Sequence, residues 1–149
     1  MATRHQGSAA EKRALDAYIK LRRAVNAVSL REGEVMRAAG LTESQFGALE
    51  ALLHLGPLCQ HELAGKVLKS AGNMTTVVDN LERRGLVERR RDGEDRRVVT
   101  VHLTASGRDL VRAVFPRVVE VLVDAFSTLS ATEQQQLAAL CRRLGTAES

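Results

Sequence analysis

Aromatic residues are scarce in this sequence of 149 residues, which has no tryptophan, one tyrosine and three phenylalanines. Proteins that bind single-stranded nucleic acid usually stack bases on exposed rings, so the scarcity argues against that class. The sequence also shows neither an apolar run of about 18 residues nor a charged-then-apolar leader, which argues against a helical membrane span and a signal peptide. We therefore expect a cytoplasmic protein with no membrane partner.

Cysteine is scarce as well, since the chain has only Cys59 and Cys141. Two cysteines cannot build the disulfide framework of a small secreted protein, which favours a reduced, cytosolic setting. A single bridge between them stays open at this point. His61 and Glu62 follow Cys59 closely, but no further ligand or catalytic partner follows at a recognisable spacing, although His54 could join His61 in the fold. We expect no metal, no cofactor and no catalytic residue.

Apolar residues make up 44% of the chain, enough for a hydrophobic core, and the net charge is +4. A basic balance is consistent with a polyanionic partner, although +4 alone is weak evidence. The positive charge is concentrated between Arg83 and Arg97, where seven arginines stand against four acidic residues. The position of this segment in the fold decides whether it is a binding surface or an ordinary solvated face.

Six segments carry apolar residues at the spacing of an amphipathic helix. They lie near residues 11–30, 43–55, 60–68, 71–84, 105–129 and 131–144. Thr42 with Gln45, and Ser130 with Glu133, match the capping-box pattern, so each pair marks the start of a helix. The sequence thus predicts a mainly helical protein.

Glycine, proline and threonine positions indicate where these helices end or bend. Gly33 and Gly40 bracket a connection after the first helix, and Gly85 occupies a left-handed C-cap position. Thr104 caps the long helix that begins near residue 105. Pro116 lies in the middle of that helix, where the missing N–H and the clash with the preceding turn predict a kink.

Between Gly85 and Thr104 the apolar pattern changes to a period of two. Residues 86–91 form a short extended segment, and Val99, Val101 and Leu103 alternate with polar residues after a charged turn at 91–96. This pattern predicts a two-stranded hairpin. The fold class is therefore mainly α with a small β-hairpin wing, a winged helix-turn-helix with flanking helices.

Residues 71–84 form the helix expected to enter the major groove of B-DNA. Met74, Val77, Val78 and Leu81 take its inward face, which leaves short hydrogen-bonding side chains outward, with Asp79 and Asn80 further along. Arginines at the hairpin tip can reach the minor groove, and those on its first strand can meet phosphates. The predicted DNA-contacting residues are Ser70, Asn73, Thr75, Thr76, Asn80, Arg89, Arg90, Arg91, Asp95, Arg96 and Arg97.

The stretch Leu41–Leu110 resembles the MarR family of bacterial transcriptional regulators. The resemblance lies in LTESQFGALEALL and in DNLERRGLVERR, followed by Asp95-Arg96-Arg97 and Leu103-Thr104. The flanking helices match the family in order and length, so the resemblance covers nearly the whole chain. SAGNMTTVVDNLE is similar to the branch that includes quinone- and phenol-responsive regulators.

The resemblance implies an obligate homodimer whose first and last helices intertwine, and two recognition helices that bind a pseudo-palindromic operator of double-stranded DNA. It also implies that Arg97 enters the minor groove while Asp95 braces the loop. The surplus apolar face of residues 105–129 independently favours a partner. The expected organisation is a flexible tail at 1–9, a dimerisation helix and connection at 10–40, the DNA-binding domain at 41–104 and dimerisation helices at 105–149.

The resemblance further implies a cleft for a small aromatic or anionic effector. The candidate wall residues are Tyr18, Arg22, Phe46, His54, Arg112 and Phe115. Some MarR proteins sense oxidants through a thiol, which makes Cys59 and Cys141 redox candidates, although the best-known such cysteine lies in the first helix and this chain has none there.

The sequence therefore favours a sequence-specific regulator, a repressor released by a small aromatic or phenolic ligand or by an oxidant. The alternatives are a non-specific architectural DNA-binding protein and a thiol-based redox regulator. An enzyme that uses Cys59 and His61 has no phosphate loop, carboxylate pair or nucleophile elbow in its support.

Overall fold

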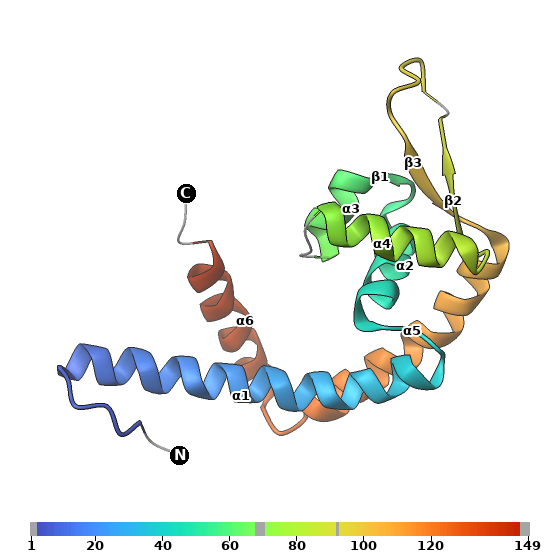
Figure 1. The fold of residues 1–149 in the computed structure, drawn as a ribbon. Helices are drawn as coiled ribbons and strands as arrows, with labels where there is room; N and C mark the ends of the chain where they lie inside the picture. Colours follow the sequence, from blue (N-terminus) through green and yellow to red (C-terminus); the bar gives the residue numbers. More distant parts are fainter. Residues whose placement is uncertain (1–2, 68–70, 92, 147–149) are drawn as a thin grey trace. The chain divides into compact units, whose positions relative to one another are not determined.

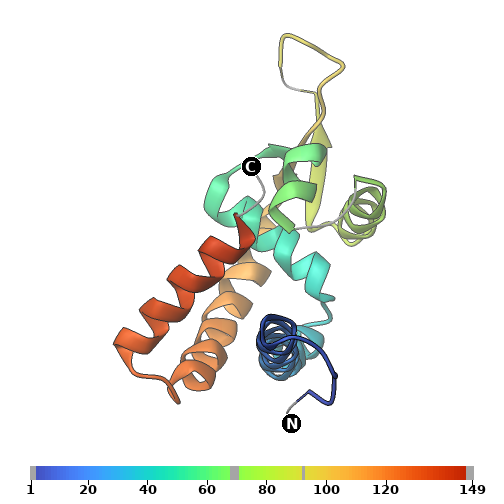
Figure 2. The ribbon, with the colours of Figure 1, turned by 90° about the vertical axis from the view of Figure 1, so that its left-hand side faces the viewer.

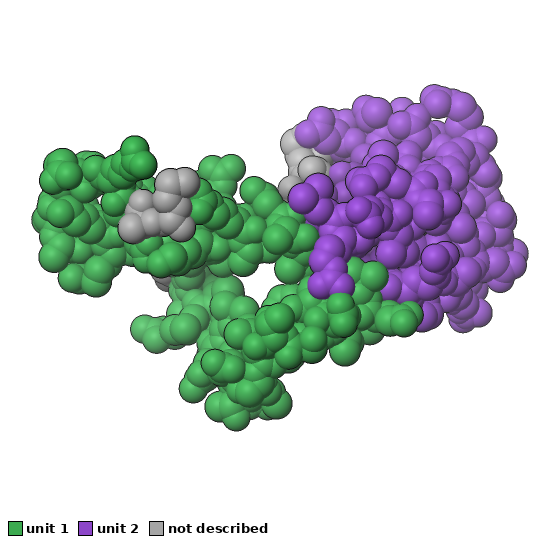
Figure 3. Space-filling model, turned by 90° about the horizontal axis from the view of Figure 1, so that it is seen from below, with its two compact units in different colours: residues 1–29, 119–149 green, residues 30–118 purple. Residues whose placement is uncertain are grey.

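The structure, a computed structural model, describes residues 3–67, 71–91 and 93–146 and divides into two compact units (Figure 3). Unit 1 contains residues 1–29 and 119–149, and unit 2 contains residues 30–118. Helices α1 (Ala9–Ala38) and α5 (Ala105–Phe126) have residues in both units, whereas α6 (Ala131–Gly145) lies in unit 1. Among the described residues, every buried apolar side chain, from Met36 to Val118, belongs to unit 2.

Unit 2 is a winged helix-turn-helix, as the sequence predicts (Figure 1). Its helices α2, α3 and α4 pack against one another, and a small antiparallel sheet lies beside them in the order β1-β3-β2. The helices span Glu43–Leu55, Gln60–Val67 and Ala71–Arg83, and the strands span Leu58–Cys59, Val87–Arg90 and Thr100–Leu103.

The core of unit 2 confirms the predicted inward face of α4. Met74, Val78 and Leu81 are fully buried, and they pack in a core that includes Leu49 and Leu63 from α2 and α3. Their i, i+4, i+7 spacing commits one side of α4 to the core, so the opposite side is left for solvent or a ligand. Val77, also predicted to face inward, is half-buried.

The capping predictions are confirmed as well. Thr42 and Ser130 each accept a hydrogen bond from the N3 backbone, and the N3 side chains of Gln45 and Glu133 bond back to the cap residue. Gly85 adopts φ +73°, a left-handed conformation that favours glycine. These local patterns fix three of the helix ends in unit 2 and unit 1.

Two sequence predictions about the elements are wrong. The sheet has a third described strand, β1, which pairs Leu58 with Val101 and Cys59 with Thr100, so the wing is not only a two-stranded hairpin. In addition, α1 continues through Gly33 to Ala38 instead of ending near Leu30. A glycine inside a helix costs only about 1 kcal/mol, and the burial of Met36 at the end of α1 offsets this cost.

Helix α5 is assigned as one helix across Pro116 and ends at Phe126, three residues before the predicted end at Leu129. The kink at Pro116 stays a prediction. None of the helices in the described part of the chain is long and apolar enough to cross a membrane.

A close backbone contact, which we call the joint, connects the end of α4 to the start of α5. The Thr104 hydroxyl donates to the Gly85 carbonyl oxygen at 2.6 Å and accepts from the Gly107 amide at 3.0 Å. The Thr104 amide donates to the Leu86 carbonyl oxygen at 3.1 Å. A Cβ on Gly107 would lie 1.9 Å from that same oxygen, so only glycine fits there.

Glu32 on α1 provides a test of the packing between α1 and α2. Partial burial, and secondarily the negative charge of Glu43, raise the pKa of the Glu32 carboxyl group. A raised pKa means that the ionised form is disfavoured in the folded state, so this group destabilises the protein above its pKa and ceases to do so once protonated.

We expect Glu32→Gln to raise the melting temperature at pH 7 by about 1–2 °C, because the partial exposure of the group keeps the effect small. The difference should shrink as the pH falls through the raised pKa of Glu32 and be absent below the ordinary glutamate value of 4.5. Thermal melts at several pH values measure this, with Glu34→Gln, an exposed site on the same helix, as the control. A gain that persists unchanged at pH 4 contradicts the electrostatic explanation.

Candidate nucleic-acid interface

The outward side of α4 carries the polar residues that the sequence assigns to DNA recognition. Asn73, Thr75 and Thr76 are exposed on the first two turns of the helix. Asn80 is half-buried, and its side-chain oxygen accepts a hydrogen bond from Arg83 Nη1 at 2.9 Å. Ser70, predicted to contact DNA, lies outside the described residues. The first turn of α4 has no acidic residue, so the positive end of the helix dipole is not neutralised there.

The wing tip, residues 91 and 93–98, projects beyond the helices of unit 2 in both ribbon views (Figures 1 and 2). Its side chains are exposed. Arg91 Nη1 donates to the backbone oxygen of Arg96 at 2.6 Å, which spans the tip from one side to the other. The loop therefore has an internal brace and presents its other arginines to solvent.

Asp95 and Arg97 form a two-pronged ion pair at the wing tip. Arg97 Nε and Nη2 donate to the two carboxylate oxygens of Asp95 at 3.0 and 3.1 Å, and the Arg97 amide donates to the same carboxylate at 3.0 Å. These bonds lower the pKa of Asp95 and raise that of Arg97, so the pair stays charged. The Arg97 side chain is 91% exposed. The ion pair is compatible with the prediction that Asp95 braces the loop while Arg97 enters the minor groove.

Arg89 and Arg90 leave β2 on opposite faces. Arg90 pairs with Glu88 on the exposed side. Arg89 shares the face of the buried Val87, because side chains alternate along a strand, and its side chain is only 23% exposed. In the free protein, the Arg89 side chain is thus turned away from solvent.

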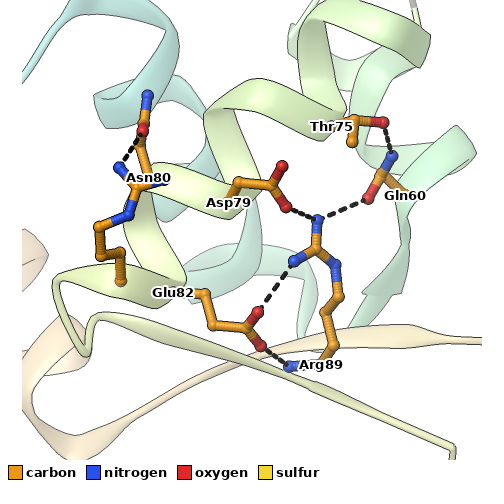
Figure 4. Close-up of polar contacts among 7 residues, drawn as sticks. Gln60, Thr75, Asp79, Asn80, Glu82 and Arg89 are labelled. Carbon is orange, nitrogen blue, oxygen red and sulfur yellow. Dashed lines mark hydrogen bonds and ion pairs between the residues drawn. The ribbon is translucent and has the colours of Figure 1, made fainter.

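Arg89 and four further residues form a set that we call the Arg89 network (Figure 4), namely Arg89, Gln60, Thr75, Asp79 and Glu82. Arg89 Nη2 donates to Asp79 Oδ1 at 2.6 Å and to Gln60 Oε1 at 3.3 Å, and Nη1 donates to Glu82 Oε1 at 2.9 Å. The Arg89 amide donates to Glu82 Oε2 at 3.0 Å. Gln60 Nε2 in turn donates to the hydroxyl of Thr75.

The sequence patterns do not single out Gln60 or Glu82. Gln60 is separated from its partners by 15 and 29 residues, and no sequence spacing reveals such a contact. The strand alternation Val87, Arg89 was the one available signal that Arg89 faces inward.

The two cysteines, both redox candidates, lie in different surroundings. Both are free, so the single bridge left open by the sequence is not formed. Cys59 is half-buried, and its amide donates to Glu62 Oε1 at 3.1 Å. Hydrogen bonds from the side chain and the backbone of Cys59 lower the pKa of the Glu62 carboxyl group. A carboxylate is the opposite of the cationic neighbour that activates a thiolate. Cys141 is exposed on α6.

The candidate effector residues are divided between the two units. In unit 1, Arg22 Nη1 donates to the Tyr18 hydroxyl at 3.3 Å. In unit 2, the rings of His54 and Phe115 meet edge to face, with centroids 4.7 Å apart. Phe46 is buried in the core, and Arg112 is exposed.

Within the described residues no group of three histidine, cysteine, aspartate or glutamate side chains is arranged to hold a metal ion. The α4 helix presents hydrogen-bonding side chains and the wing tip presents positive charge.

Comparison with known proteins shows which family and which individual proteins this chain is similar to. The model of the MarR family matches residues 41–99. YkoM of Bacillus subtilis, an uncharacterised HTH-type transcriptional regulator, is 34% identical over 134 residues, which cover 90% of this chain and 87% of that protein. The transcriptional repressor MprA of Escherichia coli is 34% identical over 113 residues, which cover 74% of this chain and 64% of MprA.

A solved structure agrees with these relatives. BpsR of Bordetella bronchiseptica, whose regulation of DNA binding by 6-hydroxynicotinic acid is the subject of that structure, superposes with a TM-score of 0.79 at 27% sequence identity. The match covers 86% of this chain and 91% of that chain.

Proposed function

Since the chain belongs to the MarR family, whose members are DNA-binding transcriptional regulators and not enzymes, we propose that it is a homodimeric repressor that binds a pseudo-palindromic DNA operator. The observation that carries the proposal is the pairing of an exposed polar face on α4 with a wing tip whose Arg97 is 91% exposed. The helix supplies groups for base edges in the major groove, and the arginine supplies positive charge for the minor groove.

The distribution of apolar residues supports the dimer. Unit 1 has no buried residue among those described, yet it exposes large apolar side chains on all three of its helices. These exposed residues are Tyr18, Val25, Val119, Val123, Leu140 and Leu144. Apolar surface of this kind usually marks an interface, and a second copy related by a twofold axis fits the symmetry of a palindromic site.

We propose that a small aromatic acid or phenol releases the repressor from DNA, as 6-hydroxynicotinic acid regulates BpsR. Such a ligand shifts the population toward a spacing of the two recognition helices that does not match the operator. The surroundings of Cys59 give an oxidant less support as the signal, because Glu62 lies beside this cysteine.

The proposal is tested by selecting bound fragments from genomic DNA and measuring fluorescence anisotropy of the selected duplex with and without competitor DNA. We expect a specific site that resists competition and a sedimentation coefficient of a dimer. Equal affinity for every duplex supports the architectural alternative instead. A monomer that ignores duplex DNA at low ionic strength overturns the proposal.

Substitutions on α4 test which residues distinguish bases. We expect Asn73→Ala and Thr76→Ala to reduce discrimination at particular base pairs by about 1–3 kcal/mol each, because an unmade base contact no longer penalises the wrong base. Affinities for a panel of single-base variants of the operator measure this. Thr132→Ala, the same chemical change on an exposed site of α6, should leave the whole panel unchanged.

A further inference from the structure

The Arg89 network joins three elements of the proposed DNA-binding unit. Arg89 comes from β2, Gln60 is the first residue of α3, and the other three members lie on α4. The Arg89 side chain is 23% exposed, against 91% for Arg97. Arg89 therefore directs its charge to partners inside the protein, whereas Arg97 presents its charge to solvent.

The first effect of Arg89 is electrostatic. Asp79 and Glu82 lie one turn apart on α4, the helix that is proposed to enter a groove lined by phosphates, and their side chains are 49% and 41% exposed. Two free carboxylates there would repel the DNA backbone. The Arg89 guanidinium contacts both of them, at 2.6 and 2.9 Å, and reduces their combined negative charge from two to one.

The second effect is orientation. The Gln60 amide uses its oxygen to accept from Arg89 and its nitrogen to donate to Thr75. Arg89 fixes the orientation of this amide, because turning it over would bring the amide NH2 against a guanidinium N–H. In the fixed orientation the Thr75 hydroxyl, which can donate or accept, takes the acceptor role. The Thr75 hydroxyl accepts from Gln60, which fixes the position of its oxygen on the exposed side of α4.

We propose, on the basis of the function proposed above, that Arg89 is a positioning residue for operator recognition, which neutralises Asp79 and Glu82 and orients Thr75 through Gln60 without contacting a phosphate. This assignment replaces the phosphate contact that the sequence suggests for Arg89. In this proposal, base discrimination by Thr75 depends on Arg89, a residue of strand β2.

The test compares Arg89→Ala with Arg97→Ala, which removes an arginine expected to touch DNA. Each arginine that contacts a phosphate makes log K fall more steeply with log salt, by about 0.9 in slope. Removing such an arginine from both subunits of a dimer therefore makes the slope shallower by about 1.8. We expect Arg89→Ala to weaken binding to the selected operator about tenfold, with a shallower salt slope that recovers when Asp79→Ala is added, because the repulsion by the unneutralised carboxylates is itself screened by salt. Discrimination among operator variants should fall at the base pair that Thr75 contacts.

A second substitution separates neutralisation from contact. In the Arg89→Ala background, Asp79→Ala should recover part of the lost affinity, because it removes the carboxylate left without its cation. Gln60→Ala should reduce discrimination at the base pair that Thr75 contacts by as much as Arg89→Ala does. It should leave the salt slope unchanged, because it removes no charge. If Arg89→Ala does not fold at the assay temperature, as judged by circular dichroism, Gln60→Ala still tests the orienting role through the loss of discrimination.

A salt slope that falls by about 1.8 in Arg89→Ala, with no recovery on removing Asp79, shows that Arg89 contacts phosphate and overturns the inference. A Gln60→Ala variant with parent discrimination overturns the orienting role. Failure of the function proposed above is distinct, because it appears in the parent protein as the absence of salt-dependent duplex binding.

Discussion

Gly107→Ala should destabilise the protein by roughly 3 kcal/mol or more, the largest effect that we expect from adding a single methyl group. The added Cβ would lie 1.9 Å from the Leu86 carbonyl oxygen and 2.8 Å from the Leu86 carbonyl carbon. Both atoms belong to the backbone, so no flexible side chain can move aside. Helix α5 must shift away from the end of α4, which also breaks the hydrogen bonds of Thr104 to Gly85 and Leu86.

Equilibrium urea unfolding at a fixed protein concentration measures the effect. Gly65→Ala is the matched control, because Gly65 lies inside α3 with open space around the position of its Cβ. This control should be neutral or more stable by up to about 1 kcal/mol, since alanine favours a helix over glycine. If Gly107→Ala unfolds at the same urea concentration as the parent, the close approach at the joint is wrong.

Arg97→Ala should weaken operator binding about a hundredfold while the melting temperature of the protein stays within the error of the parent value. A contact of this kind contributes roughly 1–3 kcal/mol, and a dimer loses two of them, one from each wing. Stability is unaffected because the Arg97 side chain is 91% exposed and its partner Asp95 lies on the same loop. The preferred sequence should change little, because minor-groove arginines respond mainly to groove width and charge.

The control for Arg97→Ala is Arg97→Lys, which keeps the charge but not the planar fork that bonds to Asp95. We expect this variant to keep most of the salt dependence and to lose part of the affinity. Anisotropy titrations at several salt concentrations measure both quantities. An Arg97→Ala protein with parent affinity at every salt concentration contradicts the placement of the wing tip on DNA.

The parts of the fold that were predictable from the sequence depend on contacts between near neighbours in the chain. The capping box of Thr42 with Gln45 is one example, and the inward spacing of Met74, Val78 and Leu81 is another. Such features repeat with a fixed spacing because the geometry of a single helix creates them. For the same reason the order of α4 and the wing follows from the residue pattern between positions 71 and 104 alone.

The parts that were not predictable depend on contacts between distant segments. Strand β1 has two residues and exists because Leu58 and Cys59 pair with β3, about forty positions later. The length of α1 depends on the burial of Met36 rather than on helix propensity at Gly33. In the candidate site, the sequence shows where the arginines are concentrated but not which of their side chains face solvent. The prediction therefore grouped Arg89 with arginines that are exposed.

The confinement of every buried apolar side chain of the described chain to unit 2 has a consequence for assembly in the cell. In the proposed dimer, the water-excluded surroundings of unit 1 come from a second molecule, so ordering of this unit is a second-order process that dilution opposes by mass action. If the protein acts as the proposed dimer, unit 1 therefore becomes ordered only when the chain has reached the concentration at which two copies associate.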